Sequence, residues 1–118
     1  MRRILFKAKR IDTGEWVEGG FFVEPYTDKV FIIQWNSTGL GFNEFIEVNP
    51  DTVCQDTGLT DKNGNKIWEN DVLGCSGNVV DYCNDGFCVN SDRPLCFMNK
   101  HNAVIGNIFD NPELMSAR

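Results

Sequence analysis

The feature of this sequence that most constrains its fold is a period-two alternation of apolar and polar side chains, which recurs in short segments that end in turn residues. Residues 3–10 show the pattern, with Ile4, Phe6 and Ala8 on one side and basic side chains interleaved on the other. Successive side chains of an extended strand point to opposite faces, so this alternation is typical of a half-buried strand. It predicts a mainly β protein.

Turn residues divide the first part of the chain into hairpins. Residues 12–15 contain Asp, Thr and Gly, which tolerate tight turns, so we expect residues 3–10 to pair with residues 16–19. Gly20 should then begin a new piece that covers residues 21–24.

Residues 29–35 are dense in β-branched and aromatic side chains, which predicts a central strand. Residues 36–41 are turn material, and a further strand is expected at residues 45–48.

We place the loosest boundary at the turn formed by residues 49–52. This divides the chain into an N-terminal β subdomain in residues 1–52 and a C-terminal subdomain in residues 53–118. Domains commonly have about 100–150 residues, so both should belong to one cooperative unit.

The second half opens with a strong hairpin signal. Asn63-Gly64 predicts a two-residue type I′ turn, because both residues reach positive φ at low cost. Residues 66–68 should then return against residues 58–61. Asn70 and Asp71 are expected to form another polar turn, in which Asn70 adopts a left-handed conformation.

The last part of the chain has short apolar pieces separated by Gly, Asn, Asp, Ser and Pro. In residues 76–102 this spacing predicts a small barrel or meander. Residues 103–109 predict a final strand, and residues 111–114 a short C-terminal helical turn with Asn111 as its cap and Pro112 as its first residue.

The charge of the chain limits its partners. With 17 acidic and 11 basic side chains the formal net charge is -6, which disfavours nonspecific binding to nucleic acid. Basic side chains are concentrated near the start, at Arg2, Arg3, Lys7, Lys9 and Arg10. A solvated strand face explains them best, and a binding patch is the alternative.

Nothing near the start resembles an export signal. Two basic residues precede only three consecutive apolar ones, whereas a signal peptide has an apolar stretch of about 7–15 residues. No run approaches the roughly 18 apolar residues that cross a bilayer. We therefore expect a cytoplasmic protein without a membrane span.

Four of the five cysteines, Cys75, Cys83, Cys88 and Cys96, have the spacing C-x7-C-x4-C-x7-C. Structural zinc sites use cysteine pairs about two to four residues apart, and only the central pair approaches that spacing. Zinc is therefore the less favoured alternative. We expect free thiols that pack in or against strands rather than a disulfide framework.

The sequence predicts no catalytic, cofactor-binding or metal-binding residue. Residues 61–65 resemble the start of a calcium loop, but its sixth and twelfth positions hold Lys66 and Val72 instead of Gly and Glu. His101 is the only histidine, so a histidine zinc cluster cannot form within one chain. No phosphate-binding glycine loop or nucleophile elbow is present.

Carboxylates and aromatic residues leave alternatives open. We assign a set of carboxylates to solvated outer strand faces, with a metal-dependent nuclease as the alternative: Glu15, Glu18, Glu44, Glu47, Glu69, Asp71 and Asp85. Three tryptophans, Trp16, Trp35 and Trp68, accompany nine phenylalanines. Core packing explains most of them, and a contact surface could use the remainder.

Three blocks of sequence are long enough to compare with known families. They are KAKRIDTGEWVEGGF, VNPDTVCQDTGLTDKNGNKIWENDVL and VIGNIFDNPELM. In this order they resemble the pattern of the YopX family of phage and prophage proteins, and they bracket nearly the whole chain. The middle block is the most specific.

The resemblance implies a phage or prophage origin, a bacterial cytoplasm and a β-rich fold whose second half is a small SH3-like barrel. It implies no reaction, so no functional residue is carried over. Asn70 replaces a typical Gly, and Cys54 and Asp56 replace the Gly and the aromatic residue expected beside Gln55. Residues 75–96 fall in the family's variable region, which weakens a metal site there.

These observations favour an interaction module over an enzyme. The expected partner is a host or phage protein, and a homo-oligomer is also open. The alternative is a nucleic-acid module, because small β-barrels can present aromatic residues to single strands. Net charge disfavours that alternative.

Overall fold

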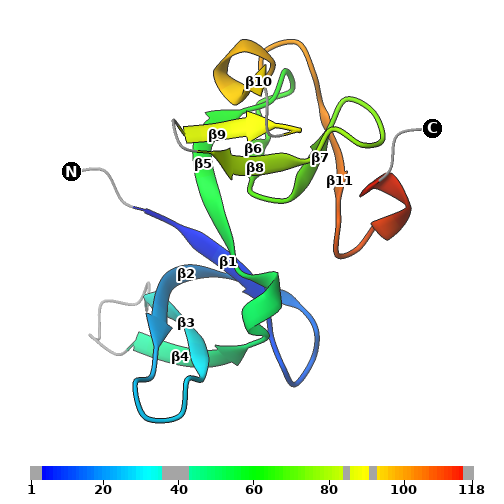
Figure 1. Ribbon diagram of the computed structural model, residues 1–118. Helices are drawn as coiled ribbons and strands as arrows, with labels where there is room; N and C mark the ends of the chain where they lie inside the picture. The colour runs from blue at the N-terminus through cyan, green and yellow to red at the C-terminus, as the bar shows by residue number, and fades with distance from the viewer. Residues whose placement is uncertain (1–3, 36–42, 84–85, 91–92, 116–118) are drawn as a thin grey trace. The chain divides into compact units, whose positions relative to one another are not determined.

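The computed structural model describes residues 4–35, 43–83, 86–90 and 93–115. The protein is mainly β, as predicted, and its strands form antiparallel sheets (Figure 1). Its contacts divide the chain into two compact units, Met1–Gln55 and Asp56–Arg118. Each unit has its own buried core, so we describe them in turn.

The first unit is built from consecutive antiparallel strands. Its strands are β1 (Phe6–Lys9), β2 (Trp16–Val23), β3 (Val30–Trp35), β4 (Asn43–Val48) and the start of β5 (Cys54–Thr60). They are hydrogen-bonded in the order β4-β3-β2-β1-β5. The predicted hairpin between the first two strands is confirmed, with Ala8 opposite Val17. The expected break at Gly20 is wrong, because β2 continues and pairs Gly20 with Ile33.

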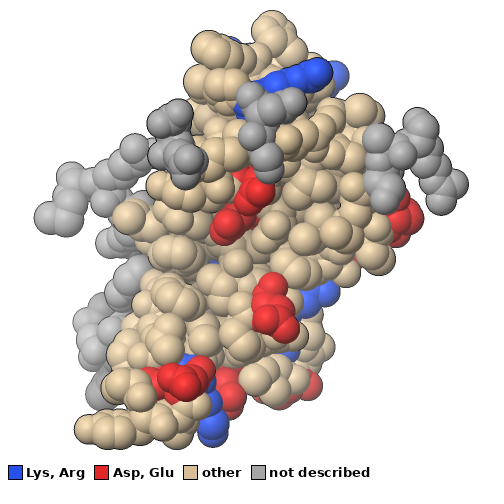
Figure 2. All heavy atoms as spheres, viewed as in Figure 1, with Lys and Arg blue, Asp and Glu red and all other residues tan. Residues whose placement is uncertain are grey.

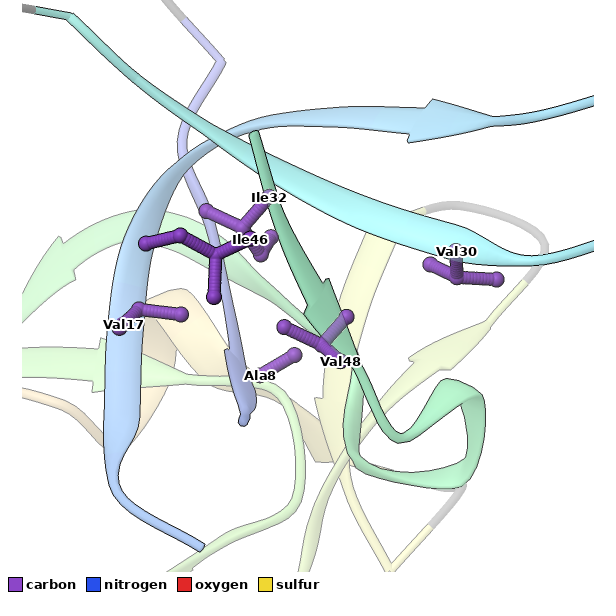
Figure 3. Packing of buried hydrophobic residues seen from close by; sticks show 6 residues of the cluster. All are labelled: Ala8, Val17, Val30, Ile32, Ile46 and Val48. Carbon is purple, nitrogen blue, oxygen red and sulfur yellow. The ribbon is translucent and has the colours of Figure 1, made fainter. Parts of the chain in front are cut away.

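Period-two alternation creates the core of this unit. The buried side chains point inward from four strands (Figure 3) and are Ala8, Val17, Val30, Ile32, Ile46 and Val48. Ile32 and Val48 are fully buried. Ile4, which shares the parity of Ala8, is exposed because β1 begins only at Phe6. Gly19 is required where β2 leaves β1 for β3, since a Cβ there would overlap the carbonyl oxygen of Ile33.

The end of β1 also contacts β4. Arg10 and Val48 form an isolated antiparallel bridge. The Ile11 N–H donates to the Glu47 carbonyl (3.2 Å), and the Asn49 N–H donates to the Lys9 carbonyl (2.8 Å). Beyond this point the 3-10 turn η1 (Pro50–Thr52) leads into β5.

The second unit consists of shorter strands. They are β6 (Lys66–Trp68), β7 (Asp71–Leu73), β8 (Val80–Cys83), β9 (Gly86–Val89), β10 (Arg93–Pro94) and β11 (Val104–Asn107), with the 3-10 turns η2 (Leu95–Phe97) and η3 (Pro112–Met115). β5 pairs with β6, β9 lies between β8 and β10, and β7 pairs with β11. The buried core comprises Ile67, Leu73, Val80, Val89 and Leu95.

These pairings form open antiparallel sheets and do not confirm an SH3-like barrel. The final turn is of the 3-10 type rather than α-helical, and the Leu114 N–H donates to the Asn111 carbonyl (2.9 Å). Asn70 has a φ of 72°, which confirms the expected left-handed conformation. Its N–H donates to Val80 (2.7 Å) and its carbonyl accepts from Ile108 (3.1 Å).

The hairpin between β5 and β6 has a different turn from the predicted type I′. Of the two residues Asn63 and Gly64, only Gly64 has a positive φ (84°). The Gly64 N–H donates to the Asp61 carbonyl (3.0 Å), and the Asp61 N–H donates to the Asn65 carbonyl (2.8 Å). This is a three-residue loop in which a tight turn precedes a left-handed Gly. The Asp61 side chain selects it by accepting from the Asn63 N–H (2.9 Å).

Cys83 and Cys88 form a disulfide across the β8–β9 hairpin, with 6.1 Å between their Cα atoms. The expectation of free thiols is therefore wrong for these two residues. Cys83 lies opposite Gly86, so Cys88 is its diagonal neighbour on the facing strand. The Cα separation of these two residues falls within the range that a disulfide spans, whereas sequence spacing alone does not reveal this register.

Candidate interaction surfaces

The first unit exposes aromatic side chains on the sheet face opposite its core. Four side chains lie at alternate strand positions that point away from the buried cluster: Phe22, Phe31, Ile33 and Phe45. The Phe22 ring centroid lies 6.4 Å from that of Phe31 and 6.2 Å from that of Phe45. Phe22 is 38% exposed and Phe45 is 56% exposed. We call these four residues the aromatic face.

Strand register explains why these side chains form one cluster. Phe22 is opposite Phe31 across the β2–β3 pair, and Ile33 is opposite Phe45 across the β3–β4 pair. Cross-strand neighbours on one face have their Cβ atoms about 4.5–5.5 Å apart, so the aromatic groups pack together without leaving the surface. The sequence alternative of an aromatic contact surface therefore applies to phenylalanines of β2, β3 and β4.

A shallow hollow of about 290 Å³ lies beside β4. Its lining residues are Arg10, Ile11, Asp12, Glu44, Phe45, Ile46 and Glu47. The Arg10 guanidinium donates to both carboxylate oxygens of Asp12, from Nε and Nη2, each at 2.9 Å. This side-chain hydrogen bond lowers the pKa of Asp12 and raises that of Arg10. The positive charge of Arg10 in the hollow is therefore paired with Asp12. The negative charges of Glu44 and Glu47 then make the hollow net negative.

Lys7 and Lys9 lie on one face of β1 together with Trp16. Lys7 Nζ lies 4.5 Å from the centroid of the Trp16 ring, and Lys9 Nζ lies 5.4 Å from it. Cations over an indole ring are attracted by its negative face. Arg2 and Arg3 lie outside the described residues. The described part of the basic cluster thus contacts Trp16 and, through Arg10, Asp12.

Two carboxylates of the second unit are buried and hold the backbone. Asp61, which is 5% exposed, accepts from the N–H groups of Asn63 and Asn65 with Oδ1 and of Val104 with Oδ2, each at 2.9 Å. The pKa of Asp61 is lowered, and the hydrogen bond from the Val104 N–H is the largest cause. Asp71 is 3% exposed and accepts from the Trp68 N–H (2.8 Å).

The assignment of Asp71 to a solvated outer face is therefore wrong. It begins β7 and reaches back three residues to the end of β6, so its carboxylate fixes the connection between the two strands. Sequence reasoning also missed the role of Asp61. The short polar string from Asp61 to Asn65 contained a signal, because aspartate side chains commonly accept from N–H groups two residues onward.

Of the other carboxylates predicted to be solvated, Glu44 and Glu47 line the hollow beside β4. Glu15, Glu18 and Glu44 are exposed, and Glu47 and Glu69 are half-buried. Asp85 lies outside the described residues. Figure 2 shows acidic side chains in separate groups on the face in view. Within the described ranges no group of three metal-ligating side chains converges.

The remaining cysteines are free thiols, as predicted for them. Cys54 is buried in β5, whereas Cys75 and Cys96 are exposed and lie outside the strands, so the expected packing in or against strands is wrong for these two. Cys75 Sγ accepts from the Asn78 side chain (3.2 Å).

Among the helices of the described residues, none is long and apolar enough to cross a membrane.

The fold and surfaces define a small antiparallel β protein with an exposed aromatic sheet face. Its sequence matches the family model described as "YopX protein" over residues 5–116. The chain therefore belongs to the YopX family. A solved structure, protein EF1440 from Enterococcus faecalis, shares its fold with a TM-score of 0.59 and 24% identity, and the match covers 98% of this chain and 100% of that chain. No curated protein matches the present chain.

Proposed function

We propose that this protein is a phage or prophage accessory protein that binds another protein through the aromatic face. The observation that supports this is the contact of Phe22 with Phe31 and Phe45 on a sheet face that is not used for the core. Removing apolar surface from water yields roughly 25 cal/mol per Å². Aromatic side chains are also enriched in protein interfaces, where they often dominate the binding energy.

The family supplies the biological setting of the proposal. We propose that the protein acts in the cytoplasm of a bacterial host and that its partner is a host or phage protein, with self-association as a further possibility. The SH3-like arrangement of the second half is also part of the proposal. It rests on the family resemblance, and small barrels of this kind commonly serve as scaffolds for binding surfaces.

The proposal is tested by affinity capture from phage-infected or lysogenic cells. A Phe22→Ser/Phe45→Ser double variant should lose a stoichiometric partner that the wild-type protein retains. Phe97→Ser is the matched control, because Phe97 is 75% exposed but lies in η2, outside the aromatic face. Circular dichroism should verify that each variant is folded. Equal recovery with all three proteins would contradict the aromatic face, and no partner at any expression level would contradict the interaction module.

Nucleic-acid binding is the second candidate function. Lys7 and Lys9 beside Trp16 combine cations with an aromatic ring, which is a feature of single-strand binding surfaces. Both ammonium groups lie over that ring, however, and the net charge is -6. Titration with single-stranded DNA at low salt should show no mobility shift. A shift that Lys7→Ala/Lys9→Ala abolishes would favour this candidate instead.

A further inference from the structure

The outer edge of β4 is paired along only part of its length. β3 pairs with all six residues of β4, from Asn43 to Val48. On the other side, the end of β1 bridges Val48 and the Ile11 N–H donates to the Glu47 carbonyl (3.2 Å). The direction of that hydrogen bond shows that the backbone groups of Glu47 point away from β3.

The same geometry determines the orientation of Phe45. In a strand, backbone groups of alternate residues point to the same side, so the N–H and C=O of Phe45 point to the same edge as the Glu47 carbonyl. No strand of the described residues pairs with the edge at Phe45. The hollow of about 290 Å³ lies along this edge, bounded by residues 44–47 on one side and residues 10–12 on the other.

The charges around the hollow specify its occupant. Glu44 and Glu47 lie on opposite faces of β4, because their separation is odd. Arg10 is engaged by Asp12, so the hollow is net negative. A second copy that paired through this edge would bring two more glutamates to a hollow that is already net negative, and the repulsion between like charges disfavours that pairing. Lysine or arginine side chains on an added strand would instead complement both glutamates.

We propose that the edge of β4 at residues 44–47 binds an extended cationic peptide segment, which adds to the sheet as a further strand. Its backbone bonds to the N–H and C=O of Phe45, apolar side chains contact the Phe45 ring, and basic side chains approach Glu44 and Glu47. Strand addition is a common mode of peptide recognition, in which backbone bonds give affinity and side chains give specificity. The inference rests on the proposed function, because it names the chemistry of the partner segment.

The test uses the full chain and three blocked hexapeptides at low salt. They are Lys-Lys-Val-Val-Lys-Lys, its glutamate counterpart Glu-Glu-Val-Val-Glu-Glu, and Lys-Lys-Pro-Pro-Lys-Lys, in which the central residues cannot donate backbone hydrogen bonds. Fluorescence anisotropy should show binding of the first peptide only. In ¹⁵N-labelled protein the largest amide shifts should occur at Phe45 and its neighbours. Equal binding of the proline peptide would overturn strand addition, and equal binding of the acidic peptide would overturn the charge argument.

Variants locate the site. Glu44→Gln and Glu47→Gln should each weaken binding about twofold to fivefold, as expected for exposed ion pairs, whereas Glu113→Gln in η3 should have no effect. Phe45→Pro removes the outward N–H, which edge strands tolerate, and should weaken binding at least about tenfold more than Phe45→Ala. If Phe45→Pro does not fold, the proline peptide still tests the backbone bonds.

Two further outcomes separate this inference from the proposed function. Loss of the cellular partner in Phe22→Ser, with full retention in Glu44→Gln/Glu47→Gln and no peptide binding, contradicts the strand site but leaves the interaction module intact. Sedimentation that shows a dimer abolished by Phe45→Pro, again without peptide binding, overturns the cationic occupant in favour of a second copy.

Discussion

Single buried carboxylates hold together segments of the second unit that are distant in sequence. Asp61 bonds both to its own hairpin loop and to the N–H of Val104, which is 43 residues away. These donors stabilise the ionised carboxylate, and the pKa of Asp61 is accordingly below its ordinary value. The residue therefore links the stability of this unit to pH.

Acid should weaken the fold through Asp61. A group whose pKa is lower in the folded state stabilises the protein fully above its unfolded pKa, about 4 for aspartate, and loses that contribution as pH falls through the folded pKa. Urea unfolding should thus show a midpoint that falls as pH decreases below about 4. Asp61→Asn should be less stable at pH 7 and show a flatter dependence in this acidic range. A dependence as steep as that of the wild type would contradict the assignment.

The left-handed backbone at Asn70 leads to a second prediction at the residue scale. A Cβ without a compensating polar group costs roughly 1–2 kcal/mol in this conformation. Asn70→Ala should therefore be about 1 kcal/mol less stable than Asn70→Gly, because Gly adopts this conformation without a steric penalty. Chemical denaturation of the two variants measures the difference. Equal stabilities would mean that the backbone at this position relaxes when the side chain is removed.

At the scale of elements, the disulfide fixes the β8–β9 hairpin. Tyr82 lies opposite Phe87 within it, with ring centroids 5.1 Å apart. Cys83 and Cys88 enclose a short loop, for which the chain-entropy relation gives a stabilisation of about 2 kcal/mol. The bond therefore contributes to an element that has few residues with which to form a core.

Thiol counting tests this arrangement. In the native protein, Cys75 and Cys96 should react rapidly with a thiol reagent, and the buried Cys54 should react only on unfolding. Two further thiols should appear after reduction. A Cys83→Ser/Cys88→Ser variant should keep the first three thiols and lose about 2 kcal/mol of stability. Five reactive thiols in unreduced, unfolded protein would contradict the disulfide.

The comparison of sequence with structure is informative at this scale. Alternation and turn residues correctly predicted the β1–β2 hairpin, and the density of β-branched and aromatic side chains correctly predicted the strand Val30–Trp35, because both are local properties of the sequence. The disulfide was not predictable, since it depends on which residue faces Gly86 across the hairpin. The aromatic face was foreseen only as an alternative, because its membership depends on the register of β3 against both neighbours. Asp71 was misassigned because burial of a charge depends on tertiary partners.

On the scale of the whole molecule, the strand β5 runs through the division between the two units. β5 pairs with β1 at Cys54 and Gln55 and with β6 at Asp56 and Thr60. Because this strand contributes to both units, we predict that they unfold together as one cooperative domain.

Core truncations test cooperativity. Ile32→Ala in the first cluster and Leu73→Ala in the second should each cost about 2–5 kcal/mol, because both side chains are fully buried. Each variant should lower one common calorimetric transition rather than split it. Two separate transitions, of which each variant moves only one, would contradict a single domain.

The bridge between Arg10 and Val48 bears on whether the protein aggregates at high concentration. Amyloid growth requires long, unprotected strand borders that many molecules can extend in succession. Here the bridge pairs one end of the outer edge of β4. The part of that edge that stays unpaired within the described residues is short and is flanked by Glu44 and Glu47. These glutamates act as gatekeepers, so concentrated samples should bind little thioflavin T, and Glu44→Val/Glu47→Val should convert the same border into a site of fibril growth.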